Sequence, residues 1–200
     1  MYADRLYCGI LVIMKPVKLL KNCISLKDAE SIIDYINKNQ DSFVTGPKKL
    51  KFQKMFGKDN LRKISSEGFI FGLDEIEKEI KKVIDFSIKS VVNQFQETEE
   101  VYLSSIWLTK QLAGADVPMH QDIEGGANKH YVYSAILYLS TNYKSSPLEF
   151  PRLNLNIVPE FGDLVMFESS ELHEVKTIDE ERYAIPMWFT KDKDHELKFA

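Results

Sequence analysis

The feature that most constrains this chain is a series of short, β-rich segments that fills its C-terminal half. Turn-forming residues separate the segments, including Gly125-Gly126 and the stretch from Pro159 to Asp163. Short strands at close spacing predict an antiparallel barrel or a double-sheet jelly roll. The predicted strands cover residues 101–112, 131–140, 148–150, 153–158, 163–167, 172–178 and 182–190.

The first hundred residues have a different pattern. The apolar run at 6–14 predicts a first strand, and Ser25 with Asp28 three residues later predicts a capping box at the start of a helix. Residues 74–96 carry apolar side chains at helical spacing and predict a second, longer helix whose charged run 75–82 faces solvent. The predicted buried positions of the two helices are Ile32, Ile33 and Ile36 in the first, and Ile76, Ile80, Val83, Ile84, Ile88, Val91, Val92 and Phe95 in the second.

Helices followed by a run of strands indicate an α+β fold, in which the helices pack on one side of the larger sheet of a jelly roll. The chain has 200 residues and is 44% apolar, which suffices for a sizeable core. Since no repeat or low-complexity linker interrupts it, residues 1–200 are predicted to be a single domain. Residues 1–100 supply a strand and supporting helices, and residues 101–190 supply the jelly-roll core.

Charge and cysteine content narrow the class of protein. A formal charge of −4 and a pI near 5.7 favour neither nucleic acid nor a membrane surface as a partner, so a peptide or small molecule is expected. Cys8 and Cys23 are too few to staple a domain of this size, and the run at 6–14 is too short to span a bilayer and lacks a cleavage pattern. These features predict a cytoplasmic protein.

One local exception to this charge balance is the segment 48–63, where seven basic residues interleave with Phe52 and Phe56. A solvated loop is the favoured interpretation. The alternatives are an anion-binding surface and a loop that closes over substrate.

The histidines carry the chemistry. His120 and Asp122 have the i, i+2 spacing that places two side chains on the same face of an extended strand, where both can bind one ion. A structural hydrogen bond between them would give the same sequence pattern. His130 and His173 are both candidates for a third ligand, whereas His195 lies in a charged tail. Two imidazoles and one carboxylate on a jelly roll match the facial triad of non-haem Fe(II) oxygenases. A zinc hydrolase would need a nearby general base, and the sequence has no HExxH arrangement.

From about Trp107 to Thr190 the chain resembles the 2-oxoglutarate- and Fe(II)-dependent oxygenases of the prolyl 4-hydroxylase-like group. The resemblance consists of His120-x-Asp122, the strand AILYLS, the strand LEF, the segment VPEFGDLVMFESSELHEV and Arg182 at the start of RYAIPMWFT. In this family a basic residue follows the distal histidine by nine or ten positions, and Arg182 follows His173 by nine. The resemblance therefore favours His173 over His130.

The resemblance implies a site and its cofactors. His120, Asp122 and His173 would bind Fe(II), and Arg182 would pair with the far carboxylate of 2-oxoglutarate, with Tyr138 beside it. For Phe167 and Trp188 a packing role is favoured. Where many relatives have Gly-Gly before the Leu-x-Phe strand, this chain has Ser146-Pro147, which puts a substrate inferred from the nearest prolyl hydroxylases in doubt.

The implied reaction is hydroxylation of a substrate carbon by O2, with 2-oxoglutarate converted to succinate and CO2 and ascorbate as a possible reductant. A peptidyl residue is the favoured substrate, and a free amino acid or small metabolite is the alternative on the same site. A non-catalytic jelly-roll binding module and a metal-dependent hydrolase are the alternatives of other classes.

Overall fold

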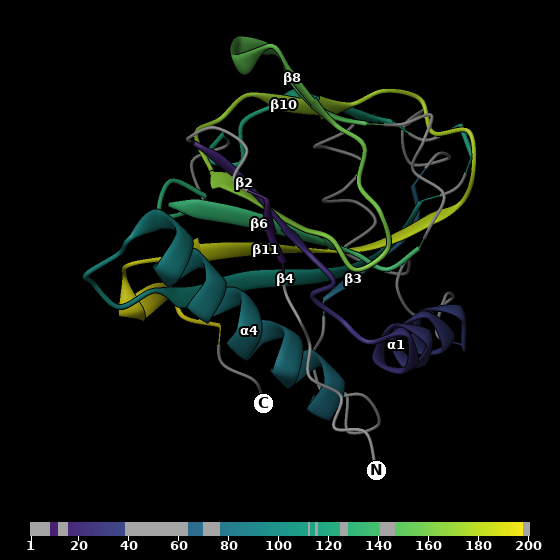
Figure 1. Cartoon of the computed structure of the whole chain (residues 1–200), viewed down its shortest axis with the longest axis horizontal. Coiled ribbons are helices and arrows are strands. Elements are labelled where there is room, and N and C mark those ends of the chain that lie inside the picture. The colour runs from purple at the N-terminus through teal and green to yellow at the C-terminus, as the bar shows by residue number, and fades with distance from the viewer. Residues whose placement is uncertain are drawn as a thin grey trace.

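The computed structural model describes residues 9–11, 16–38, 64–69, 77–111, 113–114, 116–124, 128–140 and 147–197. Its strands form two antiparallel sheets, one of seven strands in the order β1-β2-β9-β6-β11-β4-β3 and one of four in the order β5-β10-β7-β8. The small sheet lies over the large one, and helices α1 and α4 cover the opposite face of the large sheet (Figure 1). This is the predicted jelly roll with helices on one side of the larger sheet.

In the second half of the chain, the predicted strands are found in the predicted order. The helices are α1 (Leu26–Lys38), α4 (Glu77–Phe95) and the short 3-10 turns η2 (Pro151–Leu153) and η3 (Lys193–His195). The strands are β1 (Gly9–Leu11), β2 (Val17–Lys21), β3 (Ile64–Phe69), β4 (Tyr102–Gln111), β5 (Val117–His120), β6 (Tyr133–Tyr138), β7 (Leu148–Phe150), β8 (Leu155–Ile157), β9 (Leu164–Glu168), β10 (His173–Val175) and β11 (Arg182–Thr190).

Three strands lie outside the predicted set. The predicted first strand, residues 6–14, is described only at β1, and the chain then forms β2, which pairs with β9 in the large sheet. Strand β2 has the sequence VKLLK, in which Lys18 and Lys21 interrupt the apolar residues. Strand β3 pairs with β4, and β5 pairs with β10. These three strands have four to six residues, and runs of this length fit more than one periodic pattern.

Helix α1 begins as the sequence predicts. The hydroxyl of Ser25 accepts a hydrogen bond of 3.1 Å from the backbone N–H of Asp28, which satisfies one of the unpaired donors of the first turn. Ile32 and Ile36 are fully buried, and Ile33 packs against the same core while only partly buried. The buried stripe is completed by Ala29.

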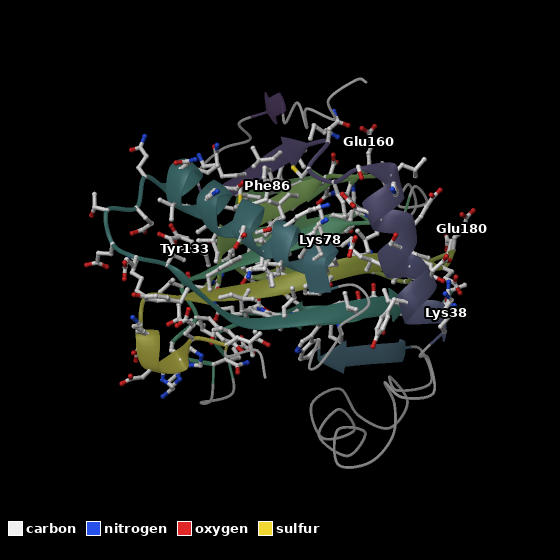
Figure 2. All side chains as sticks on the ribbon, turned by 90° about the horizontal axis from the view of Figure 1, so that it is seen from below. Lys38, Lys78, Phe86, Tyr133, Glu160 and Glu180 are labelled. Atoms are coloured by element: carbon white, nitrogen blue, oxygen red, sulfur yellow. The ribbon has the colours of Figure 1, made fainter. Side chains whose placement is uncertain are left out.

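The two faces of the large sheet bury different clusters. Toward the helices, side chains of β4, β6, β9 and β11 meet those of α1 and α4, and Figure 2 shows both helices lying across these strands. Toward the small sheet a second cluster fills the barrel and includes Tyr138, Phe150, Phe167, Val175 and Ala184. Because side chains alternate along a strand, β2, β6, β9 and β11 each contribute to both clusters.

Two of the remaining predictions concern membranes and cysteines. In the described part of the chain no helix combines the length and apolarity that a transmembrane span requires. Cys23 is buried, with its Sγ 3.7 Å from the carbonyl oxygen of Lys21, and Cys8 lies outside the described residues. The basic segment 48–63 also lies outside them, so the structure does not test its predicted role.

Candidate active site

His120, Asp122 and His173 come together at one end of the barrel. His120 is the last residue of β5 and His173 the first of β10, and the two are directly opposite in the antiparallel pair. Their ring centroids lie 4.3 Å apart. One potential ligand atom from each of the three residues falls within 4.8 Å of the other two.

The position of Asp122 corrects one step of the sequence argument. Strand β5 ends at His120, so Asp122 lies in the following turn and not on the same strand face. The turn is anchored by a 3.0 Å hydrogen bond from the backbone N–H of Asp122 to the carbonyl of Ser169. The i, i+2 spacing therefore reflects a strand end followed by a turn, and the anchor to Ser169 brings the carboxylate to the histidines.

Both imidazoles direct the same ring atom toward the centre of the triad. The Nδ1 of His120 lies 2.8 Å from the carbonyl oxygen of Pro118, and the Nδ1 of His173 lies 3.0 Å from that of Glu171. A carbonyl oxygen only accepts hydrogen bonds, so each Nδ1 carries the proton and Nε2 keeps its lone pair in the neutral ring. Such a bond to the outer nitrogen fixes the tautomer and orientation of metal-binding histidines.

The carboxylate of Asp122 faces both rings. Its Oδ1 lies 3.3 Å from Nε2 of His120 and its Oδ2 lies 3.8 Å from Nε2 of His173. Burial raises the pKa of Asp122, but the hydrogen bond from His120 and the charge of His173 outweigh burial and leave this pKa below its usual range. Asp122 is therefore an ionised carboxylate in a buried position.

The two histidines differ in charge preference. Burial lowers the pKa of His120, yet the hydrogen bond to Asp122 more than compensates and leaves the pKa above its usual range. Burial dominates at His173, whose pKa lies below its usual range. The ionised carboxylate of Asp122 lies beside both rings, and a buried negative charge of this kind favours a cation next to it.

The donor set fits a divalent transition metal. Two imidazole nitrogens and one carboxylate oxygen are the ligands of the facial triad of Fe(II) oxygenases, which leaves coordination positions open for other ligands. The ring of Phe167 packs against His173 with centroids 4.7 Å apart, and Phe150 lies behind it at 6.1 Å. Phe167 is fully buried in the barrel core, where it supports the ring of His173.

Arg182 and Tyr138 lie on the large sheet and face the same barrel interior. Tyr138 belongs to the inner cluster and is opposite Ala184 on β11. Arg182 is two residues before Ala184 and therefore shares its face. The Arg182 side chain is buried, and its Nε–H donates a hydrogen bond to the amide oxygen of Gln111, the residue opposite it on β4.

The register of the sheet separates the triad end from the arginine end. Ser134, whose hydroxyl contacts Asp122, is opposite Trp188 on β11. Tyr138 is four residues further along β6 than Ser134, or about 13 Å at ~3.3 Å per residue. Figure 1 shows β10, which carries His173, on the side of the barrel facing β6 and β11.

His130 and His195 lie together at a second place. Their rings stack with centroids 3.9 Å apart, and Nε2 of His130 lies 2.9 Å from the hydroxyl of Ser104. His195 belongs to η3 and lies 3.7 Å from Asp192. Neither histidine belongs to the group formed by His120, Asp122 and His173.

Trp188 belongs to a group of half-buried aromatic residues. Its ring makes an edge contact with Trp107 at 5.0 Å and stacks on Tyr131 at 6.0 Å. A surface pocket of about 350 Å³ lies next to Tyr131 and is lined by Ile123 and Ser170, which directly follow Asp122 and Ser169. None of the triad residues lines this pocket.

Sequence reasoning missed three polar residues of the barrel interior: Ser134, Ser169 and Gln111. Ser134 lies with Tyr138 on the inward face of the otherwise apolar strand β6, and a buried polar residue inside such a strand is the signal that could have identified it. Gln111 lies opposite Arg182 at the end of β4, whose inward face also carries Ser105 and Thr109, so it does not stand out. Ser169 follows the end of β9 and gives no such signal.

Comparison with known proteins agrees with this geometry. Residues 106–190 match the family model described as the 2OG-Fe(II) oxygenase superfamily. A search of curated proteins found no significant match.

Solved structures of prolyl hydroxylases share the fold. A prolyl hydroxylase in complex with a hypoxia inducible factor oxygen degradation domain peptide fragment, from Trichoplax adhaerens, is 20% identical, covers 90% of this chain and 85% of its own, and has a TM-score of 0.67. The viral collagen prolyl hydroxylase from Paramecium Bursaria Chlorella virus-1 is 13% identical, with 88% and 96% coverage and a TM-score of 0.65. A Pseudomonas putida prolyl-4-hydroxylase is 15% identical, with 88% and 92% coverage and a TM-score of 0.63.

The double-stranded β-helix is shared with these prolyl hydroxylases, and the His-Asp-His cluster has the donor set of the non-haem Fe(II) oxygenases. Residues 106–190, which match the 2OG-Fe(II) oxygenase superfamily, include all three triad residues and Arg182. This match supports an enzyme of the 2-oxoglutarate-dependent dioxygenase class, for which the family implies Fe(II), 2-oxoglutarate and O2.

Proposed function

We propose that the protein hydroxylates a peptidyl residue, with proline as the first candidate, and that His120, Asp122 and His173 bind its Fe(II). The observation that carries this proposal is the convergence of three ligand atoms within 4.8 Å in a barrel that also buries Arg182. When bound, iron with 2-oxoglutarate would supply O2 activation, so that a substrate C–H bond becomes C–OH while 2-oxoglutarate yields succinate and CO2.

The protein's side chains would bind the metal and 2-oxoglutarate and hold them in a fixed orientation. The backbone carbonyls of Pro118 and Glu171 hold the two imidazoles with Nε2 toward the triad centre. Arg182 would pair with the far carboxylate of 2-oxoglutarate, because a guanidinium fork matches a carboxylate in a buried setting. Tyr138 would line the same space. Gln111 would fix the rotation of the guanidinium by occupying its Nε–H.

The case for a peptide rests on similar folds. The Trichoplax adhaerens prolyl hydroxylase is described in complex with a peptide fragment, and the viral relative is described as a collagen prolyl hydroxylase. At identities of 20% and 13%, these two proteins suggest which peptides to include among the substrates tested. Ascorbate as reductant and a cytoplasmic location are part of the same proposal.

The test is a succinate assay with Fe(II), 2-oxoglutarate and ascorbate in air, run against proline-containing peptides and against free amino acids. We expect peptide-stimulated succinate and a peptide product heavier by one oxygen atom. Stimulation by a free amino acid alone would favour the small-metabolite alternative. Absence of any 2-oxoglutarate turnover would favour a non-catalytic binding module, and activity that ignores oxygen would favour a hydrolase.

A further inference from the structure

Two buried serines connect to the carboxylate of Asp122 from the side of the large sheet. The Ser134 hydroxyl lies 2.6 Å from Oδ2 of Asp122 and 2.8 Å from the hydroxyl of Ser169. The exposed fractions are 2% for Ser134 and 0% for Ser169, so bulk water does not compete for these contacts.

The direction of the two hydrogen bonds follows from the donors present. An ionised carboxylate only accepts, and a hydroxyl has a single proton to donate. Ser134 must therefore donate to Asp122, which leaves Ser134 to accept from Ser169. The chain of donors runs from Ser169 through Ser134 to Oδ2 of Asp122.

Ser169 also holds the main chain of the same aspartate. Its carbonyl oxygen accepts the 3.0 Å hydrogen bond from the backbone N–H of Asp122. Ser169 itself is fixed by a 3.0 Å hydrogen bond from its N–H to the carbonyl of Val132, two residues before Ser134. The turn that carries Asp122 is thus attached to β6 and to the end of β9 through both its backbone and its side chain.

We infer that Ser134 and Ser169 form a positioning relay that holds Oδ2 of Asp122 and turns Oδ1 toward the metal, so that the aspartate binds through one oxygen. This inference rests on the proposed role of Asp122 as a ligand. Both serines are positioning residues, since they act through Asp122. A carboxylate that binds through one oxygen occupies one coordination position and leaves more of them for 2-oxoglutarate and O2.

The test measures metal binding without turnover. Apo-protein is titrated with Mn(II), and unbound Mn(II) is followed by electron paramagnetic resonance. Loss of a partner that orients a metal ligand typically weakens metal affinity about 10- to 100-fold. We expect a loss of this size in Ser134→Ala, a smaller loss in Ser169→Ala, and affinity close to wild type in Ser134→Thr, which keeps the hydroxyl.

A matched control makes the same chemical change elsewhere. Ser87 is a buried serine of α4, on the helix side of the large sheet, and Ser87→Ala is expected to leave Mn(II) affinity unchanged. The thermal stability of each apo-variant is measured beside it. A merely structural role for Ser134 would lower that stability and leave the Mn(II) affinity of the folded fraction at the wild-type value.

Each outcome decides between the relay and the proposed function. If wild-type protein binds no Mn(II), the proposed function fails. If Asp122→Ala loses Mn(II) but Ser134→Ala and Ser169→Ala bind it as tightly as wild type, only the relay is wrong. Should Ser134→Ala not fold, Ser169→Ala decides alone, because it keeps Ser134, and wild-type affinity in that variant overturns the relay.

Discussion

The two faces of the large sheet use the same strands for different purposes. On β11, Tyr183, Ile185 and Met187 point toward the helices and join the apolar cluster there. The alternate residues of that strand, Arg182 among them, face the barrel interior. The helix-covered face buries apolar area, which stabilises the fold in proportion to that area. The inner face also buries apolar side chains, but charged and hydroxyl groups lie among them, and their burial is unfavourable unless each finds a partner.

This difference between the two faces indicates that the functional residues lie on the inner face of the large sheet. Buried polar groups on the inner face have specific partners: Arg182 with Gln111, Ser134 with Asp122, and the two histidine Nδ1 atoms with backbone carbonyls. Specific partners of this kind fix the geometry of buried polar groups. Substitutions on the inner face should therefore change ligand binding more than stability, and substitutions on the helix face should do the reverse.

The largest expected effect is at the triad. His173→Ala should reduce Fe(II)-dependent succinate formation to the level of metal-free protein, because it removes one of three ligands. His130→Ala is the matched control, since His130 stacks on His195 away from the triad and should keep activity. Loss of Fe(II) binding in the His130 variant with retention in the His173 variant would reverse the assignment of the ligands.

Arg182→Ala should weaken 2-oxoglutarate binding. Leaving a buried carboxylate without its charge partner costs about 2–5 kcal/mol, which corresponds to roughly 30-fold or more in Kd. The measurement is calorimetric titration of 2-oxoglutarate into the Mn(II)-loaded protein under argon. Arg182→Lys keeps the charge but loses the two-pronged guanidinium, so its Kd for 2-oxoglutarate should lie between those of wild type and Arg182→Ala. An unchanged Kd in Arg182→Ala would refute the assignment of Arg182 to the 2-oxoglutarate carboxylate.

Ile185→Ala changes the helix-covered face of β11, the strand that also carries Arg182. Ile185 is fully buried under the helices, and truncating such a side chain lowers the free energy of unfolding by about 2–5 kcal/mol. Urea unfolding should show this loss, while the folded variant keeps its Kd for 2-oxoglutarate. Ile185→Val should show a smaller loss of stability. A change in Kd comparable to that of Arg182→Ala would break the division between the two faces.

The smallest expected effect is at Gln111. Gln111→Leu removes the acceptor of the Arg182 Nε–H and leaves a buried donor unsatisfied, at about 1–3 kcal/mol. We expect a rise in the KM for 2-oxoglutarate that is smaller than in Arg182→Ala, with kcat nearly unchanged. Thr109→Val is the control on the same strand face, since Thr109 bonds to the carbonyl of Ala184 at 2.9 Å and not to Arg182. Equal KM values in Gln111→Leu and wild type would show that the guanidinium needs no such support.

The sequence predicted the architecture because β4 and β11, of ten and nine residues, carry β-rich patterns long enough to recognise. It did not predict β2, β3 and β5, whose pairing with β9, β4 and β10 leaves no local signal. The cap at Ser25 was predictable because it depends on neighbours three residues apart.

The site divides in the same way. The spacing of His120, Asp122, His173 and Arg182 was visible through the family resemblance. The turn at Asp122 and the contacts of Ser134 depend on residues that are distant in the sequence. Asp122 and Ser169, which are hydrogen-bonded, are 47 positions apart, and no local pattern encodes such contacts. Long-range polar contacts are therefore the part that only the folded chain reveals.

The most direct test of the division between the two faces is a crystal structure of the protein with Mn(II) and 2-oxoglutarate, grown without oxygen. The account predicts metal bonded to Nε2 of His120, Nε2 of His173 and a carboxylate oxygen of Asp122, with the far carboxylate of 2-oxoglutarate on Arg182. Metal at any other group of side chains, or 2-oxoglutarate outside the barrel, would contradict it.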